Sequence, residues 1–150
     1  MTTTYRGAWN HAEVSEFLEQ SSFPIRLAGV GADGFPRVVS LWFRHQQDRI
    51  LCVSHRDSHL IKLLTANPRV GFEVAPNEPP YYGVRGQAVA RLEPLGDQST
   101  LHELLNRYLG GSDSGLGQWL LERSDEELLI TLTPARIYSW DYRSRMADAV

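Results

Sequence analysis

The sequence is poor in several features that define whole classes of proteins. Its 150 residues contain one cysteine, Cys52, so no disulfide can form within the chain. No apolar run approaches the roughly 20 residues that a membrane-spanning helix needs. The first residues lack the basic start and apolar middle of a signal peptide. We therefore expect a cytoplasmic protein without a membrane partner.

The chain also lacks an excess of positive charge. Its net charge is −3 and its pI is near 5.9, whereas a general nucleic-acid binder needs a basic face. Of its 15 basic residues, Lys62 is the single lysine and the other 14 are arginines. Arginine offers a planar group that can hold a phosphate or a carboxylate through two hydrogen bonds. We expect small-molecule binding and no nucleic-acid partner.

The composition and pattern of the sequence indicate one domain, residues 1–150, that contains both strands and helices. We expect a helical segment at 1–22 and a barrel at 23–145. Hydrophobic residues make up 42% of the chain, which suffices for one real core. Hydrophobic periodicity and turn residues predict the elements. We expect strands at 25–30, 37–44, 50–53, 70–74, 81–92, 127–133 and 136–142, and helices at 9–20, just before Pro68, at 97–109 and at 116–121.

Short turns join most of these strands, and the helical excursions between them are brief. This pattern favours a mainly β fold, an antiparallel split β-barrel with six or seven strands and peripheral helices, over a doubly wound α/β fold. The strand at 37–44 is nearly continuous in apolar residues, so we expect it to be covered on both faces. Gly83 and Gly86 predict a bulge or a close backbone approach within the strand at 81–92.

The stretch 50–74 has the pattern of an anion site. An apolar strand is followed by a polar turn, a short helix and a second strand. Asp57 or Ser58 can cap the helix, and the free N–H groups of its first turn favour a phosphate beside Arg56 and His59. The same features also occur in proteins whose helix is only capped and whose arginine is only solvated.

Five segments, in their order along the chain, resemble segments of a known family. This family is the pyridoxamine-5′-phosphate-oxidase-like, flavin-binding split-barrel proteins. The segments are 34–36 with 38–43, 50–54, 58–64 with 67–70, 84–88, and 129–142. The resemblance implies a six-stranded split barrel that works as a homodimer, with two equivalent flavin sites at the subunit interface. It also implies FMN as the cofactor, with the deazaflavin coenzyme F-420 or haem as alternatives.

The same resemblance suggests the site. In relatives, one strand lies along the flavin ring, and the polar turn and helix start hold the ribityl phosphate. On this basis we expect cofactor-binding roles for Val38, Val39, Ser40, Leu41, Ser54, Arg56, Ser58, His59, Lys62 and Tyr81, and a substrate pocket that includes Trp42, Tyr82, Trp140 and Arg143. Trp140 and Arg143 match a region that approaches the flavin from the partner chain, although Trp140 is equally consistent with a core aromatic.

The chain departs from the family pattern directly after Ser58. Relatives show two basic residues there, whereas this chain has His59 and Leu60. His59 can replace one donor when it is protonated, and Leu60 cannot replace the other. True oxidation of pyridoxamine phosphate is therefore less expected, because the residues for a substrate phosphate are not found.

Other chemistries fit the sequence poorly. His55 ends a strand and His59 begins a helix, so the two need not converge on a metal, and no further ligand set follows. Cys52 lies in an apolar strand, and no Gly-x-Ser-x-Gly elbow is present. If a flavin binds, its own N5 exchanges the hydride and no protein acid or base is required.

We therefore expect a flavin- or deazaflavin-dependent oxidoreductase that transfers hydride to or from a small planar substrate. Two alternatives stay open. One is a protein that sequesters a flavin or haem without turnover, and the other is a barrel that has lost its cofactor and serves as a structural partner.

Overall fold

The computed structural model describes residues 2–147. Eight strands and five α-helices alternate along the chain, with one 3₁₀ turn before the last strand. The elements are β1 (Thr4–Gly7), α1 (His11–Gln20), β2 (Ile25–Val30), β3 (Pro36–Leu41), β4 (Arg44–Gln46), β5 (Arg49–His55), α2 (His59–Ala66), β6 (Arg69–Val74), β7 (Tyr82–Pro94), α3 (Ser99–Leu109), α4 (Gly115–Glu122), η1 (Ser124–Glu126), β8 (Glu127–Asp141) and α5 (Arg143–Met146).

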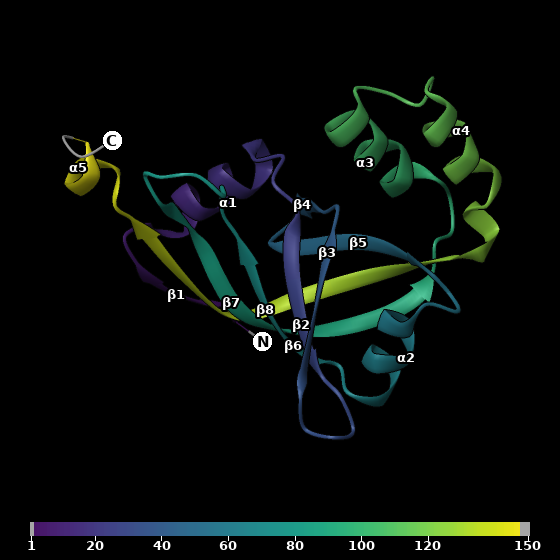
Figure 1. Cartoon of the computed structure of the whole chain (residues 1–150), viewed down its shortest axis with the longest axis horizontal. Coiled ribbons are helices and arrows are strands. Elements are labelled where there is room, and N and C mark those ends of the chain that lie inside the picture. The colour runs from purple at the N-terminus through teal and green to yellow at the C-terminus, as the bar shows by residue number, and fades with distance from the viewer. Residues whose placement is uncertain (1, 148–150) are drawn as a thin grey trace.

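All eight strands belong to one sheet, which curls into a half-barrel. Its strand order is β3-β2-β6-β7-β8-β5-β4, and every pair in this series is antiparallel. Strand β1 adds a parallel pairing to β8. Figure 1 shows β8 crossing the whole molecule, from the end beside α4 to the end beside α5. The split-barrel prediction is confirmed, with eight strands in place of six.

Two helices begin at side-chain caps, and the second lies at one of the two residues that the sequence offered. Asn10 caps α1 in a full capping box, in which the side chains of Asn10 and Glu13 each accept the other residue's backbone N–H. The hydroxyl of Ser58, rather than the carboxylate of Asp57, caps α2 by accepting from the Ile61 N–H at 3.2 Å. The apolar side of α2 then packs against the sheet.

The strand predicted at 37–44 is wrong in two respects. It ends at Leu41, because Phe43 turns into the core with no exposed surface and its N–H donates to the Tyr108 hydroxyl at 3.2 Å. It is also not covered on both faces, since Val38 is 67% exposed within the single chain. The one predicted strand is thus two strands, β3 and β4. The outward face of β3 belongs to an open surface.

The break predicted at Pro134 is also wrong. Strand β8 continues through it, because the register slips there: Gln87 faces Arg136 while Ala88 faces Pro134. Ala135 is the extra residue of a β-bulge, a position where a proline's missing N–H costs little. The predicted close approach at Gly86 is confirmed, since a Cβ there would lie 2.4 Å from the Arg136 carbonyl oxygen.

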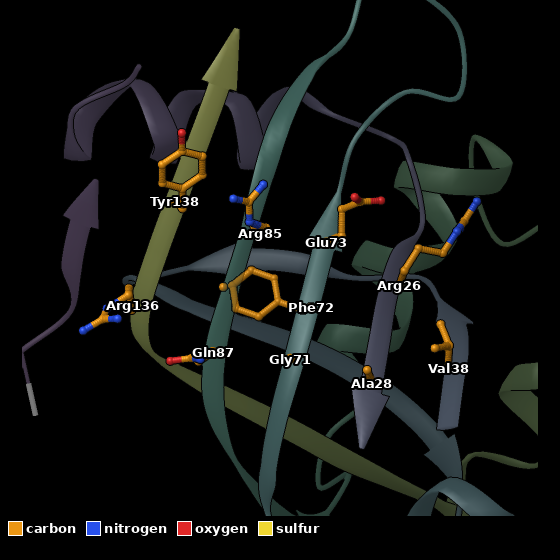
Figure 2. Close-up of a pocket in the computed structure, with 11 residues that line it drawn as sticks. Arg26, Ala28, Val38, Gly71, Phe72, Glu73, Arg85, Gln87, Arg136 and Tyr138 are labelled. Atoms are coloured by element: carbon orange, nitrogen blue, oxygen red, sulfur yellow. The ribbon is translucent and has the colours of Figure 1, made fainter. Parts of the chain in front are cut away.

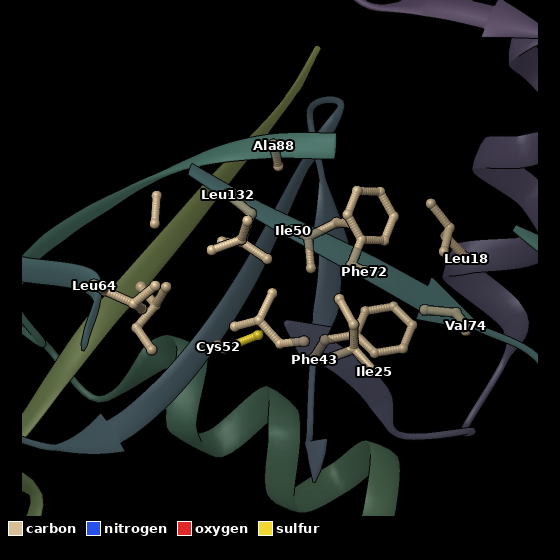
Figure 3. Close-up of a cluster of buried hydrophobic side chains, with 14 of the residues drawn as sticks. Leu18, Ile25, Phe43, Ile50, Cys52, Leu64, Phe72, Val74, Ala88 and Leu132 are labelled. Atoms are coloured by element: carbon tan, nitrogen blue, oxygen red, sulfur yellow. The ribbon is translucent and has the colours of Figure 1, made fainter. Parts of the chain in front are cut away.

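The core fills the concave side of the sheet beneath α1 and α2. Figure 3 shows part of this cluster, in which side chains of β2, β5 and β6 meet those of the two helices. A smaller cluster of Leu95, Leu101 and Leu105 attaches α3 to the sheet near Trp42 and Val53. The α3–α4 pair therefore stands at one end of the half-barrel (Figure 1).

Candidate functional site

A pocket of about 400 Å³ lies where β3 and β5 end beneath α3 and α4. The sheet, the turn after β5 and both helices contribute to its wall. Its lining consists of Ser40, Leu41, Trp42, Val53, Ser54, His55, Leu101, Leu104, Leu116, Leu120 and Glu127. We refer to it as the helix-covered pocket. Four residues predicted for the site therefore converge here: Ser40, Leu41, Trp42 and Ser54.

Apolar side chains form most of this wall. Leu101 and Leu104 are buried on the inner side of α3. Trp42 stacks on Tyr108 of the same helix, with ring centroids 5.2 Å apart and planes 6° from parallel. The Tyr108 hydroxyl also donates to the Phe23 carbonyl at 3.1 Å, which ties α3 to the start of β2. Trp42 is thus held by packing while it borders the pocket.

The polar groups gather at the end of the pocket where β5 meets β8. His55 and Glu127 lie directly opposite each other in the ladder. His55 Nε2 lies 3.1 Å from Glu126 Oε2, and His55 Nδ1 accepts the Asp57 N–H at 3.0 Å. Because Nδ1 accepts a hydrogen bond, Nε2 is the ring nitrogen that can donate to Glu126. Burial raises the pKa of the Glu127 carboxyl, His55 opposes this rise, and Glu126 adds to it.

The predicted phosphate-binding turn adjoins this pocket. The hydroxyls of Ser54 and Ser58 lie 2.9 Å apart, so the end of β5 contacts the first turn of α2. Arg56, His59 and Lys62 are exposed, and the Arg56 guanidinium lies 4.0 Å from the Asp57 carboxylate. Two hydroxyls, a helix start and exposed basic side chains can together bind an anion.

The surroundings of Leu60 give a physical reason for the departure from the family pattern at this position. Its side chain is only 6% exposed and packs in the main core cluster with Ile61 and Leu64. It therefore faces away from the turn and offers no donor. The acidic groups Asp57 and Glu126 further weaken the positive field of Arg56 and His59.

The two valines of the predicted flavin-facing strand point in opposite directions. Val39 packs against the core cluster, so only its backbone faces outward. Val38 lies on the open convex face, in a second hollow of about 580 Å³ that Figure 2 shows. There a cross-strand row runs from Val38 through Ala28 and Gly71 to Gln87. We refer to this surface as the outer sheet face.

The remaining predicted residues lie at the other end of the molecule. Tyr82 belongs to an aromatic cluster with Trp9 and Phe17. The Arg143 guanidinium lies 4.3 Å from the centre of the Tyr82 ring. Arg143 also donates to both carboxylate oxygens of Asp141, at 2.9 and 2.7 Å, which holds the pKa of Asp141 at about 2. The Arg85 guanidinium is 5.5 Å from the Trp140 ring.

Tyr81 lies beside this group. It is 46% exposed, and its carbonyl accepts the Tyr142 N–H at 2.9 Å. One chain thus holds the predicted residues as two separate groups. From Glu127 to Trp140 the path along β8 is roughly 40 Å at about 3.3 Å per residue.

Sequence reasoning missed seven residues of the helix-covered pocket. In the sequence, His55 is only the end of a strand and Glu127 only the start of one, and their pairing depends on the register of β5 with β8. The leucines of α3 and α4 were assigned to helix packing, since a leucine stripe has the same pattern at a core and at a pocket. The missed residues are Val53, His55, Leu101, Leu104, Leu116, Leu120 and Glu127.

Two further properties concern the part of the chain that the structure describes. Within residues 2–147, no helix is both long and apolar enough to cross a lipid bilayer. Within the same residues, no three histidine, cysteine, aspartate or glutamate side chains gather into a group that could bind a metal ion.

Comparison with known proteins defines the class of this chain. A model of the family described as pyridoxamine 5′-phosphate oxidase matches residues 11–141, which is most of the chain. The chain therefore belongs to this family, as its sequence resemblance indicated. A search of curated proteins finds no match.

Solved structures share the fold at low sequence identity. A conserved hypothetical protein from Mycobacterium tuberculosis aligns over 97% of this chain and 92% of its own, with 21% identity and a TM-score of 0.79. An F420 reductase aligns over 81% and 94%, with 20% identity and a TM-score of 0.67. The haem storage protein of Vibrio cholerae aligns over 83% and 89%, with 20% identity and a TM-score of 0.63.

Proposed function

We propose that the protein is a homodimeric oxidoreductase that uses a flavin, with FMN as the first candidate and a deazaflavin as the second. The observation that carries the proposal is the contact between Ser54 and Ser58, which joins a polar helix start to the helix-covered pocket. Family membership supports it, and so does the fold shared with an F420 reductase. In this proposal residues 1–150 act as one cofactor-binding domain.

The residues at the pocket fit a flavin phosphate in part. Ser54 and Ser58 offer hydroxyls, the first turn of α2 offers backbone N–H groups, Arg56 offers positive charge, and His59 offers a further hydrogen-bond donor. Lys62 lies one turn farther along the same helix. The strand formed by Val38, Val39, Ser40 and Leu41 would run beside the ring system.

A bound flavin would supply hydride exchange at its N5. The chain's own residues would orient the ring and exclude water. Leu41, Trp42, Leu101 and Leu104 form a wall without charged groups, which suits a planar apolar surface. No side chain needs to act as an acid or base in such a transfer.

The proposed dimer would bring the two separated groups of site residues together. A single chain keeps Tyr81, Tyr82, Trp140 and Arg143 at the end of β8 remote from the helix-covered pocket. A second copy placed on the outer sheet face would cover Val38 and set the β7–β8 end of one chain near the pocket of the other. The row of small residues through Ala28 and Gly71 leaves room for such close packing.

A second candidate is a protein that sequesters a flavin or haem without turnover. The inward-facing Leu60 and the acidic side chains beside Arg56 favour it, because both weaken an anchor for phosphate. The fold is shared with a haem storage protein.

Separate titrations with FMN, a deazaflavin cofactor and haem test the proposal. We expect tight FMN binding that Arg56→Ala and His59→Ala each weaken about tenfold, because each removes a hydrogen-bond donor to the phosphate worth about 1.5 kcal/mol. Arg91→Ala, which removes an exposed arginine of β7, is the matched control. Preference for the deazaflavin selects that cofactor, and a Soret band selects the haem candidate. If neither flavin binds at tens of micromolar, the oxidoreductase proposal is refuted.

A further inference from the structure

The helix-covered pocket has a single kind of formal charge. Among the described residues that line it, none is lysine or arginine, and Glu127 is the one acidic side chain. Arg56 and Lys62 of the adjoining turn and helix do not line it, and neither does Arg123 at the end of α4. A ligand that enters this pocket therefore meets mostly apolar walls, the polar side chains of Ser40, Ser54 and His55, and one acidic group.

The histidine opposite Glu127 uses both of its ring nitrogens in contacts with other residues. His55 directs Nε2 toward Glu126, and its Nδ1 accepts the Asp57 N–H. No ion pair of Glu127 within 4.0 Å is found among residues 2–147. Burial raises the pKa of Glu127, and the nearby His55 opposes only part of this rise. A positive charge on a ligand would supply a counter-ion.

The opposite wall is apolar and incomplete. Helix α4 carries Leu116, Trp119, Leu120 and Leu121, yet Gly117 is its one buried residue. Leu116 lines the pocket while half of its surface is exposed. An apolar ligand body between α4 and Trp42 would cover surface that now faces water, which is favourable by about 25 cal/mol per Å².

We propose that the pocket takes an amphiphilic cation, with an apolar ring against the leucines of α3 and α4 and a protonated nitrogen at Glu127. Glu127 then determines specificity on the substrate side: it selects cations and rejects carboxylates. The inference rests on the proposed function, since it assigns the substrate side of the same site, but it can be tested without the cofactor.

Calorimetric titration of the flavin-free protein with naphthylethylamine and naphthylacetate tests the charge preference. The two probes have the same ring and opposite charges. We expect the amine to bind at least tenfold more tightly than the acid. Glu127→Gln should abolish this preference, and Glu127→Asp, which keeps the charge, should retain part of it. Glu122→Gln, which removes an exposed carboxylate of α4, is the matched control and should leave the preference intact.

Equal affinities, a preference for the acid, binding of neither probe, or a preference that survives in a folded Glu127→Gln protein would each overturn the inference. Parallel FMN titrations separate this failure from that of the proposed function. FMN binding without a cation preference would refute the ligand class alone. A cation preference without FMN binding would support the pocket assignment and refute the flavin proposal.

Discussion

Cys52 lies in the barrel interior, out of contact with water. Its side chain has no exposed surface, and burial raises the pKa of its thiol to about 12. Since the thiolate is the reactive form, we expect a disulfide reagent at about pH 8 to label no thiol in the folded protein and one per chain in denaturant. Rapid labelling of the folded protein would contradict the buried position.

Arg107 joins α3 to the end of α1. Its guanidinium donates to the carbonyls of Leu18 at 2.6 Å, Glu19 at 2.9 Å and Ser21, and it lies 4.6 Å from the centre of the Phe43 ring. Carbonyls at a helix end lack intrahelical partners and favour a cation. We expect Arg107→Ala to lower the free energy of unfolding by about 2–3 kcal/mol in urea titrations.

Two variants distinguish the hydrogen-bond network from charge alone. Arg107→Lys keeps the charge but cannot reach three carbonyls, so it should recover only part of the loss. Arg123→Ala removes a guanidinium that contacts a single carbonyl, that of Trp119, and should cost less than about 1 kcal/mol. Equal losses for Arg107→Ala and Arg123→Ala would mean that the network does not stabilise the fold.

At the scale of elements, Gly86 marks where β7 approaches its neighbours most closely. A Cβ there would lie 2.4 Å from the Arg136 carbonyl and 2.6 Å from the Phe72 ring. Because backbone cannot move aside cheaply, we expect Gly86→Ala to destabilise the protein by about 2–3 kcal/mol in thermal or urea unfolding. Gly115→Ala, whose added Cβ meets nothing within 4 Å, should have little effect.

The packing of α1 on β4 should make stability depend on pH. The His45 side chain is buried, and burial lowers its pKa below 6.5, because the Glu19 carboxylate at 3.5 Å offsets only part of the cost. The unfolded chain then binds the proton more readily. We expect stability to fall as pH drops below about 6.5, with a slope of at most about 1.4 kcal/mol per pH unit from this group.

Urea unfolding at several pH values measures this effect. His45→Gln cannot titrate, so its stability should depend less on pH over the same range. His11, which is exposed beside Asp48, provides a matched control as His11→Gln. A pH dependence that persists unchanged in His45→Gln would assign it to other groups.

The elements that the sequence predicted well are those with local signals. Asn10 with Glu13 and Ser58 with Pro68 define the ends of α1 and α2 through contacts within a few residues. The end of β3 was missed because it depends on Tyr108, 65 residues beyond Phe43. Strand β1 was missed because it pairs with β8, at the far end of the chain.

The same distinction applies to the site. Trp42, Ser54 and Ser58 could be selected because they lie in segments with a family pattern. His55 and Glu127 could not, because only the register of β5 with β8 places them face to face. The sequence also does not show which site residues belong to the pocket of one chain and which ones a partner chain would contribute.

For the whole molecule, the outer sheet face and the two ends of β8 lead to one prediction. If a second copy covers the outer sheet face, an arginine in place of Ala28 would set a charged side chain between the two sheets. We expect the wild-type protein to have twice the 17.0 kDa mass of the chain in light scattering, and Ala28→Arg to have the mass of one chain. Glu103→Arg, a charge change on the exposed side of α3, should remain a dimer.

The same variant tests whether the cofactor site needs both chains. Because about 40 Å of strand separates Trp140 from the helix-covered pocket, one chain cannot place both against one flavin ring. We therefore expect folded, monomeric Ala28→Arg to bind FMN at least tenfold more weakly than the dimer does. A monomer that keeps full affinity would mean that the pocket, the Ser54–Ser58 turn and α2 suffice for binding. Tyr81, Tyr82, Trp140 and Arg143 would then have no part in holding the cofactor.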